Sequence, residues 1–421
     1  MFNKRQWSRF LLALKNRDHS TIISAFFNGI FRCLGLFFSV PTIALLWVLK
    51  PFIWIKVGGL IYERIGHLAL NTDLFLRRRQ LGIYPDRPFY CFFCNSNNVA
   101  NRQLLDMWKR VIPVCESRVL SWLYYGMLPI LNKTPFYLEL PINSNEYYEF
   151  NNAKPSLYFT PEEMNKGRNI LHKLNVDFEK EKFVCIFARD DAYLRQTFPQ
   201  NKYFTPWDYH DARNADINNL VETAKYLISK GFVVIRVGSI VKKPINFFHK
   251  KLIDYPYSTH QSDFMDIFLM VNCEFVISSG FSGLTDVAAI SDTPMLVVNI
   301  GEFGYSPFTK NCLYIPKKYK YLNTDNYLHF KDALKLGAFW QNPADQGLEL
   351  EENSPEDILE ATQEMLERLE NKFSYSPDSK KLIQAYHKLW GESNVNGRPN
   401  KTPIAIEWLK KKSKLVFLNL Y

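Results

Sequence analysis

The chain has 421 residues, which is too long for one ordinary hydrophobic core and predicts at least two domains. Hydrophobic residues make up 47% of it and aromatic residues 15%, so a disordered chain is excluded. Its formal net charge of +10 predicts an acidic partner, which nucleic acid, anionic lipid or a phosphorylated small molecule could provide. Seven scattered cysteines favour a reducing cytoplasm over a secreted disulfide framework.

Residues 1–50 differ in composition from the rest and predict a membrane-associated helical segment. Residues 33–49, CLGLFFSVPTIALLWVL, carry no charge, and basic residues flank them on both sides. A spanning helix needs about 20 apolar residues, and Pro41 interrupts this run. Cationic flanks on both sides favour a monotopic or re-entrant anchor. A buried helix of a soluble protein remains the alternative.

The remaining chain predicts two α/β domains and a helical tail. Residues 51–155 have a mixed α/β pattern, and a polar stretch at 143–154 marks a linker. In residues 156–345, apolar strands at 183–188, 232–237, 275–278 and 295–299 alternate with helical patterns, which is typical of a doubly wound parallel sheet. Residues 346–421 are expected to be helical and to pack back on the N-terminal half. The basic end, EWLKKKSKLVFLNLY, is expected to bind anionic membrane together with the N-terminal segment.

A glycine- and serine-rich turn between a buried strand and a helix carries the clearest functional signal. The turn contains small residues that let a ligand approach the backbone, and the helix that follows offers N–H groups and a positive dipole end. This arrangement predicts a diphosphate site, although a turn that merely connects strand and helix is the alternative. The residues concerned are Ser278, Ser279, Gly280, Ser282 and Gly283.

A set of segments in order resembles a known family of enzymes. ERIGHLALNTDLFL, FARDDAYL, DARNADI, VIRVG and SSGFSGLTDVAAISDTPMLVVN together are similar to GT-B glycosyltransferases, among them the heptosyltransferases and O-fucosyltransferase-like enzymes, and to bacterial surface-carbohydrate glycosyltransferases of about this length. The resemblance covers most of residues 53–314. It implies two Rossmann-like domains facing a cleft and a nucleotide-sugar donor as substrate. No Asp-x-Asp motif follows a predicted strand, so no metal is expected, and no cofactor is predicted. One candidate catalytic group in each half predicts a direct displacement that inverts the anomeric carbon. The implied acceptor is a glycan or a lipid-linked molecule at the cytoplasmic face of the bacterial inner membrane.

Two arginines are candidates for the donor site. Arg189 ends a predicted strand, where a guanidinium can hold a phosphate in bidentate fashion, and a salt bridge to Asp190 or Asp191 is the alternative. Fucosyltransferase-like enzymes have an His-x-Arg pattern at a similar place, but Phe187 replaces that histidine here. Arg236, followed by Gly238, lies inside a strand pattern and needs either a buried partner or an anionic ligand.

A loop before the next helix supplies further candidates for the acceptor or the cleft. Arg213 and Asn214 have no capping role and are expected to contact phosphate or acceptor. Asp216, directly before the helix, is explained well as an N-cap.

The first domain supplies the candidate base. His67 stands where heptosyltransferase-like enzymes carry the acid of an Arg-x-Gly-Asp turn, and an imidazole can accept a proton from an acceptor hydroxyl at neutral pH. A histidine that only hydrogen-bonds the start of its helix is the alternative, and Glu63 and Asp73 are reserve candidates.

Other functions remain to be distinguished. The basic residues cluster beside apolar stretches at the two ends of the chain, which suits anionic lipid and argues against nucleic acid. A nucleotide-sugar epimerase with the same fold, and a catalytically silent nucleotide- or carbohydrate-binding scaffold, stay open as alternatives to a glycosyltransferase.

Overall fold

The computed structural model describes residues 19–141, 147–197, 211–301, 309–336, 343–391 and 402–416. The chain divides into two compact units, with the boundary between residues 142 and 143. The expected boundary at residue 155 therefore lies too late, because the helix at Tyr147–Asn152 and the extended segment after it already belong to the second unit.

The first unit contains a small three-stranded parallel sheet, and a later segment forms one further bridge at its edge. β1 (Ile55–Gly59), β2 (Phe89–Cys94) and β3 (Val114–Glu116) pair in that order, joined by α3 (Ile65–Gln80) and α4 (Arg102–Val111). After α5 (Arg118–Leu131) the chain returns to the free edge of β1, where Val57 and Tyr137 form a parallel bridge. The order of strands therefore reverses beside β1, so this unit has a topological switch point of its own.

A long apolar helix covers part of the first unit. α2 (His19–Leu49) packs along α5, and the helix continues through Pro41. Its closest approach is at Gly35, where a Cβ would lie 2.5 Å from the carbonyl oxygen of Leu123. Within the described residues, the segment Gly29–Leu49 is long and apolar enough to cross a membrane. The predicted helix is therefore present, and its relation to a membrane is taken up below.

The second unit contains the predicted doubly wound sheet. Six parallel strands lie in the order β6-β5-β4-β7-β8-β9, and the four strands predicted from apolar runs are all among them. Counted along the chain, this is the order 3-2-1-4-5-6, in which the sheet reverses between β4 and β7. The strands are β4 (Phe183–Ala188), β5 (Val233–Arg236), β6 (Leu252–Asp254), β7 (Val276–Ser279), β8 (Met295–Ile300) and β9 (Cys312–Pro316).

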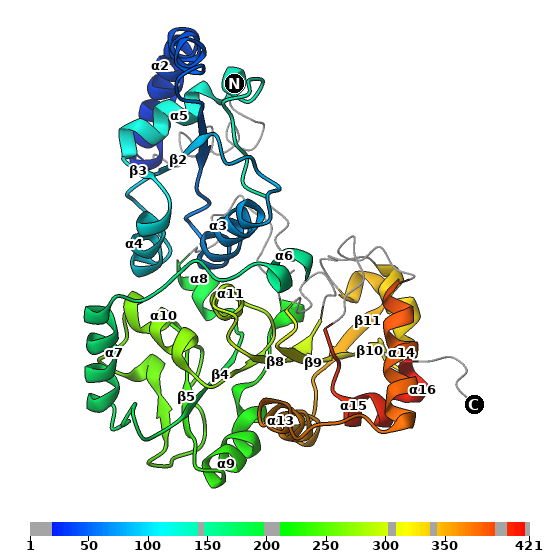
Figure 1. Cartoon of the computed structure of the whole chain (residues 1–421). Coiled ribbons are helices and arrows are strands. Elements are labelled where there is room, and N and C mark those ends of the chain that lie inside the picture. Colours follow the sequence, from blue (N-terminus) through cyan, green and yellow to red (C-terminus); the bar gives the residue numbers. More distant parts are fainter. Residues whose placement is uncertain are drawn as a thin grey trace. The chain divides into compact units, whose positions relative to one another are not determined.

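Helices cover both faces of this sheet. α9 (Val221–Ser229) and α13 (Pro355–Leu369) pack together on one face, whereas α10 (Asp263–Asn272) and α11 (Gly283–Ile290) pack together on the other (Figure 1). The strands between them are buried along nearly their whole length, as their uninterrupted apolar sequences predict. The unit also contains α6 (Tyr147–Asn152), α7 (Pro161–Lys173), α8 (Ala192–Thr197), α12 (Phe330–Ala333), α14 (Pro377–Gly391) and an antiparallel pair, β10 (Lys318–Tyr321) and β11 (Leu348–Glu351).

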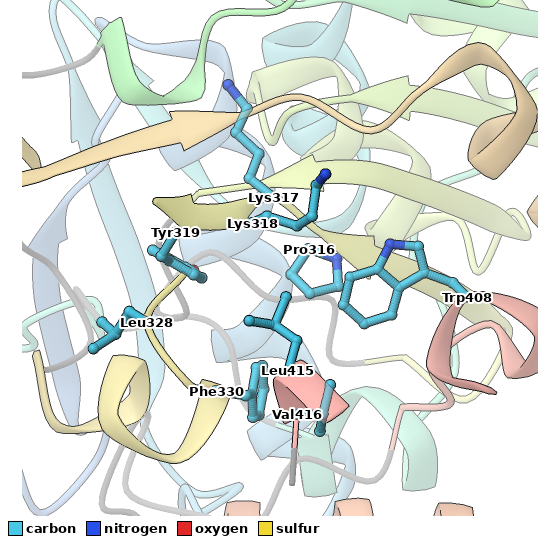
Figure 2. A pocket seen from close by; sticks show the side chains of 9 residues that line it. All are labelled: Pro316, Lys317, Lys318, Tyr319, Leu328, Phe330, Trp408, Leu415 and Val416. Carbon is cyan, nitrogen blue, oxygen red and sulfur yellow. The ribbon is translucent and has the colours of Figure 1, made fainter. Parts of the chain in front are cut away.

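The C-terminal tail packs on the second unit, not on the first as expected. α13 contacts β8 and β9, and Ile404 forms a parallel bridge with Tyr314 of β9. The apolar residues of α15 (Ile406–Lys411) and α16 (Ser413–Val416) are therefore core residues, and Trp408 and Val416 are buried. Trp408, Leu415, Val416 and Phe330 line a cavity of about 10 Å³, and Figure 2 labels their side chains. This packing contradicts the expectation that the described part of the tail binds membrane through its apolar residues.

Candidate functional site

The switch point of the second unit brings the predicted donor residues together. Arg189 directly follows β4, and its backbone N–H donates to the carbonyl of Ser279 at the end of β7 over 2.9 Å. The turn after Ser279 leads into α11, whose N-cap is Ser282. Ligands of open parallel sheets bind outside the carboxyl ends of the strands at this reversal, so the location fits a phosphate-bearing ligand.

The serine side chains of the turn have structural partners. The hydroxyl of Ser278 donates to the carbonyl of Gly280 over 2.5 Å, and Oγ of Ser279 accepts from Nδ2 of Asn299 over 2.8 Å. Both serines are fully buried. Ser282 accepts from the backbone of Leu284 as the cap of α11. These hydroxyls therefore help to shape the turn, and contact of Ser279 or Ser282 with a phosphate stays a prediction.

Gly280 is required because another loop passes against it. Its φ is +84°, and a Cβ built there would lie 2.5 Å from the carbonyl oxygen of Arg213. No side chain larger than hydrogen fits without moving that loop. The tight turn thus positions Arg213 and Asn214 at the switch point, beside the strand ends, and their contact with phosphate or acceptor stays a prediction.

Arg189 is held by a short chain of polar contacts. Its Nη1 donates to Oδ1 of Asn214, and Nδ2 of Asn214 donates to Oδ1 of Asp211 over 2.9 Å. The backbone carbonyl of Arg189 also accepts from Ala215 over 3.0 Å. The guanidinium is therefore oriented before any ligand arrives, which lowers the entropic cost of binding an anion.

The two aspartates after Arg189 have their own partners. Oδ2 of Asp190 accepts from the backbone N–H of Lys242 over 2.8 Å, and Asp191 pairs with Arg195 at 2.5 Å. These contacts differ from the salt bridge to Arg189 that the sequence left open as the alternative.

Lys317 is a second cation at this site that the sequence did not indicate. It follows β9, and its Nζ donates to the carbonyls of Ala212 and Asn214 over 3.1 and 2.7 Å. Burial lowers the pKa of Lys317 to about 8, against the opposing effect of Glu352, and the positive charge of Arg189 lowers the pKa further. Lys317 and Arg189 both bond to Asn214, so two cations approach the same loop, and an anion bound beside them would offset their charge. In the sequence, Lys317-Lys318 looks like any solvated basic pair.

Asp286 is an acidic residue at the same place. It lies in the first turn of α11, where Oδ1 is buried and has no hydrogen-bond partner among the described residues. Burial raises the pKa of Asp286 to about 8, although Arg213 opposes this shift. Around neutral pH the carboxyl group is thus mostly protonated and does not repel an anionic ligand.

Arg236 and Gly238 do not belong to this site. Nη1 of Arg236 lies 3.2 Å from Oδ1 of Asp254 on the neighbouring strand β6, so the buried arginine has a partly exposed carboxylate as its partner. The sequence had offered a ligand as the other explanation, and the expected donor-binding role of Arg236 is wrong. Gly238 has a φ of +145°, and its carbonyl accepts from Gln261 over 3.0 Å, which assigns it to the turn after β5.

Asp216 has the capping role that its position predicted. Its side chain accepts from the backbone N–H of Asn218 over 2.9 Å at the start of the helical segment, and it pairs with Lys243 at 2.7 Å. Its role is therefore explained without a ligand.

In the first unit, His67 follows the carboxyl end of β1, in the first turn of α3. Nδ1 lies 2.9 Å from Oδ1 of Asn71, whose Nδ2 donates to the carbonyl of Pro141. The amide oxygen of Asn71 therefore faces the imidazole, and Nδ1 must carry the proton. The neutral ring then presents a lone pair at Nε2, which is the form a general base needs.

The two reserve candidates differ in their surroundings. Glu63 is exposed just before α3. Asp73 is fully buried and forms an ion pair with Arg77, one turn along α3, at 2.5 Å. Removing one partner of such a pair would destabilise the helix, so Asp73 is a structural residue and does not qualify as a base.

Two tyrosines that no sequence pattern indicated, Tyr124 and Tyr125, lie at the same end of β1. A Cβ built on Gly59, the last residue of β1, would lie 3.3 Å from the hydroxyl oxygen of Tyr125. The ring centres of Tyr124 and Tyr125 lie 5.2 Å apart. Burial, together with the nearby Glu63, raises the pKa of Tyr125 to about 12. The phenol is thus a neutral hydrogen-bond donor and acceptor beside a carboxylate, a combination suited to hydroxyl-bearing ligands.

Cys91 and Cys94 both lie in β2, within an apolar run. Burial raises the pKa of Cys94 to about 12, so it is a thiol and not the thiolate that a metal or redox site needs. Within the described ranges, no group of three or more potential ligands gathers in a way that could hold a metal ion.

Comparison with known proteins gives weak structural likenesses. No protein-family model and no curated protein sequence matches the chain. A glycosyl transferase of family 9 from Veillonella parvula matches 63% of this chain and 86% of its own, with 9% identity and a TM-score of 0.41. The iron-containing heptosyltransferase TibC, solved with ADP-D-beta-D-heptose, matches 61% of this chain and 63% of its own, with 12% identity and a TM-score of 0.30. Likenesses of this size do not identify a family, so function has to be inferred from the site.

Proposed function

We propose that the protein is a glycosyltransferase whose nucleotide-sugar donor binds by its diphosphate at the carboxyl ends of β4 and β7. The observation that carries the proposal is the convergence of Arg189, Lys317 and the start of α11 at the switch point of a 3-2-1-4-5-6 sheet. Two cations and a helix N-terminus supply the charge that a diphosphate requires. Asp286, neutral at working pH, leaves this positive field intact.

The reaction follows from the groups in each unit. In the proposed mechanism, Nε2 of His67 removes the proton of an acceptor hydroxyl while its oxygen forms a bond to the anomeric carbon. The bond from that carbon to the donor phosphate oxygen breaks at the same time, and a nucleoside diphosphate leaves with the electron pair. Arg189 stabilises the negative charge that develops on this leaving group. A direct displacement of this kind inverts the anomeric configuration.

The acceptor and the location form a further part of the proposal. The exposed apolar surface of α2 supports association with a membrane, and the net charge of +10 favours an anionic one. We propose a peripheral or monotopic protein at the cytoplasmic face of a bacterial inner membrane. Its acceptor would be a glycan or a lipid-linked molecule of surface polysaccharide synthesis, bound through Glu63 and Tyr125.

A thermal-shift screen with ADP, UDP, GDP and CDP tests the donor site, with Arg189→Ala and the matched exposed control Arg168→Ala. One diphosphate should stabilise the wild-type protein and Arg168→Ala, but not Arg189→Ala. Absence of any shift in the wild-type protein would refute the proposal. With the matching nucleotide sugars, release of the nucleoside diphosphate that depends on an added acceptor and yields a glycosylated acceptor indicates transfer. Conversion of the sugar without release indicates an epimerase, and binding with neither product indicates a silent scaffold.

A further inference from the structure

α2 is apolar on almost every side that the structure exposes. Gly35 and Ser39 face α5 and are buried, but Phe37, Val40 and Val48 are 74%, 66% and 67% exposed. The helix contains no acidic residue, and its last 17 residues, Cys33–Leu49, are uncharged. An uninterrupted apolar surface of this length on a soluble monomer indicates a contact with another apolar phase or protein.

The inner side of α2 is docked on the first unit over most of its described length. The rings of Phe31 and Trp122 lie 4.8 Å apart near one end of the contact, and those of Trp47 and Phe136 lie 5.2 Å apart near the other. Between them, Gly35 allows the backbones of α2 and α5 to approach so closely that a Cβ would lie 2.7 Å from Cα of Gly126. The helix is therefore part of the packed unit and not a separate segment.

α5 in turn cannot leave the sheet. At its start, the N–H of Ser117 donates to the carbonyl of Cys94 at the end of β2 over 3.0 Å. After its end, Phe136 accepts from Val57 of β1 over 2.7 Å. Both ends of α5 are thus bonded to strands whose edges and loops need water or protein partners and cannot enter hydrocarbon.

From this packing we infer that α2 does not cross the bilayer but lies along its surface, docked on α5 by its glycine side and embedded in anionic lipid by its outer face. A crossing helix would have to leave α5 or pull the sheet into the membrane with it. The inference rests on the proposed membrane association and adds its geometry.

Cation–aromatic pairs around the helix point to lipid headgroups as the partner. Nζ of Lys50 lies 4.5 Å from the ring centre of Trp47 and 5.3 Å from that of Trp54, and Arg118 lies 4.4 Å from that of Trp122. Tryptophan with lysine or arginine is the combination enriched at membrane interfaces, where the cation meets anionic headgroups. The apolar residues between these pairs face the acyl chains.

Depth measurements in vesicles distinguish the two geometries. Leu34→Cys and Leu45→Cys, each in a Cys33→Ser background, place a fluorophore at exposed positions eleven residues apart. Since each residue turns the helix by about 100°, both positions lie on the same face. In phosphatidylglycerol-containing vesicles with spin-labelled lipids, a surface helix gives equal depths at both positions. A crossing helix gives depths that differ by about 16 Å, which would overturn the inference.

A pair of glycine variants tests the docking itself. Gly35→Val creates the clash with α5, whereas Gly29→Val, in the same helix, meets no atom within 4 Å. Gly35→Val should lower the melting temperature and make the two depths unequal, whereas Gly29→Val should change neither. Equal behaviour of the two variants would contradict docking. If the full chain forms dimers without lipid and does not bind vesicles, the face is a contact between copies and the inference is wrong. A retained nucleotide shift would show that the donor-site proposal still stands.

Discussion

Replacing Gly280 by alanine tests the donor site most directly. The backbone there has a φ of +84°, which costs an alanine about 1–2 kcal/mol relative to glycine. The new Cβ would also start 2.5 Å from the carbonyl oxygen of Arg213, against 3.4 Å or more for an ordinary contact, so the loop must retreat by about 1 Å. A misplacement of about 1 Å in a binding constellation can cost about 100-fold, because Asn214 on that loop orients Arg189.

Gly347 provides the matched control. Its φ is +68°, but a Cβ there meets no atom within 4 Å, so Gly347→Ala carries the backbone cost alone. Both variants should melt about 2–8 °C below the wild-type protein. Only Gly280→Ala should also lose affinity, by about 10- to 100-fold, for the diphosphate found in the thermal-shift screen, as measured by calorimetry. If both variants bind that diphosphate like the wild-type protein, the site does not lie at this turn.

Three further outcomes follow from the same geometry. His67→Ala should lower turnover by about 10²- to 10⁴-fold and leave diphosphate affinity unchanged, and near-normal turnover would exclude His67 as the base. Lys317→Met, which removes two charged hydrogen bonds to the loop, should weaken diphosphate binding by about 10-fold or more in calorimetry, and unchanged affinity would contradict its role. Asp286 has a raised pKa of about 8 against 3.8, so the stability that it contributes is full below pH 4 and is lost as pH rises towards 8. Between these pH values the free energy of unfolding of the wild-type protein should fall by up to about 1.4 kcal/mol per pH unit because of Asp286, and Asp286→Asn should not show this fall in denaturant unfolding. Parallel pH profiles for the two proteins would refute the assignment.

The sheet of the second unit was predictable because its strands are buried on both faces. In a chain of alternating strands and helices, apolar runs such as Phe183–Ala188 and Met295–Ile300 indicate buried strands of a parallel sheet. β6 was not predicted, because its three residues include Asp254, which pairs with Arg236. A charged residue in a strand pattern shows that a partner exists but not whether the partner is protein or ligand, and here the wrong alternative was chosen.

The packing of the tail could not be predicted for a different reason. Apolar residues next to lysines, as in Ile406–Lys411, have the same pattern whether the apolar side faces lipid or a protein core. Trp408 and Leu409 are buried in the second unit, and Lys411 pairs with Glu360 on α13 at 2.5 Å. Only the three-dimensional contacts decide between these two environments.

The candidate donor site shows most clearly why a motif is not yet a site. The glycine turn was recognisable, but its serines serve the turn itself, and the cations that would hold a diphosphate come from the ends of other strands. Lys317 lies 128 residues after Arg189, and no local pattern connects them. They lie at the same edge because β4 and β9 are parallel strands of one sheet, and each of them bonds to Asn214 although β7 and β8 separate the two strands. Gly280 allows the loop of Arg213 and Asn214 to pass close to this edge, and Lys317 and Arg189 both bond to that loop. The loop therefore couples the two cations, so that a change at any one of these positions should alter the others.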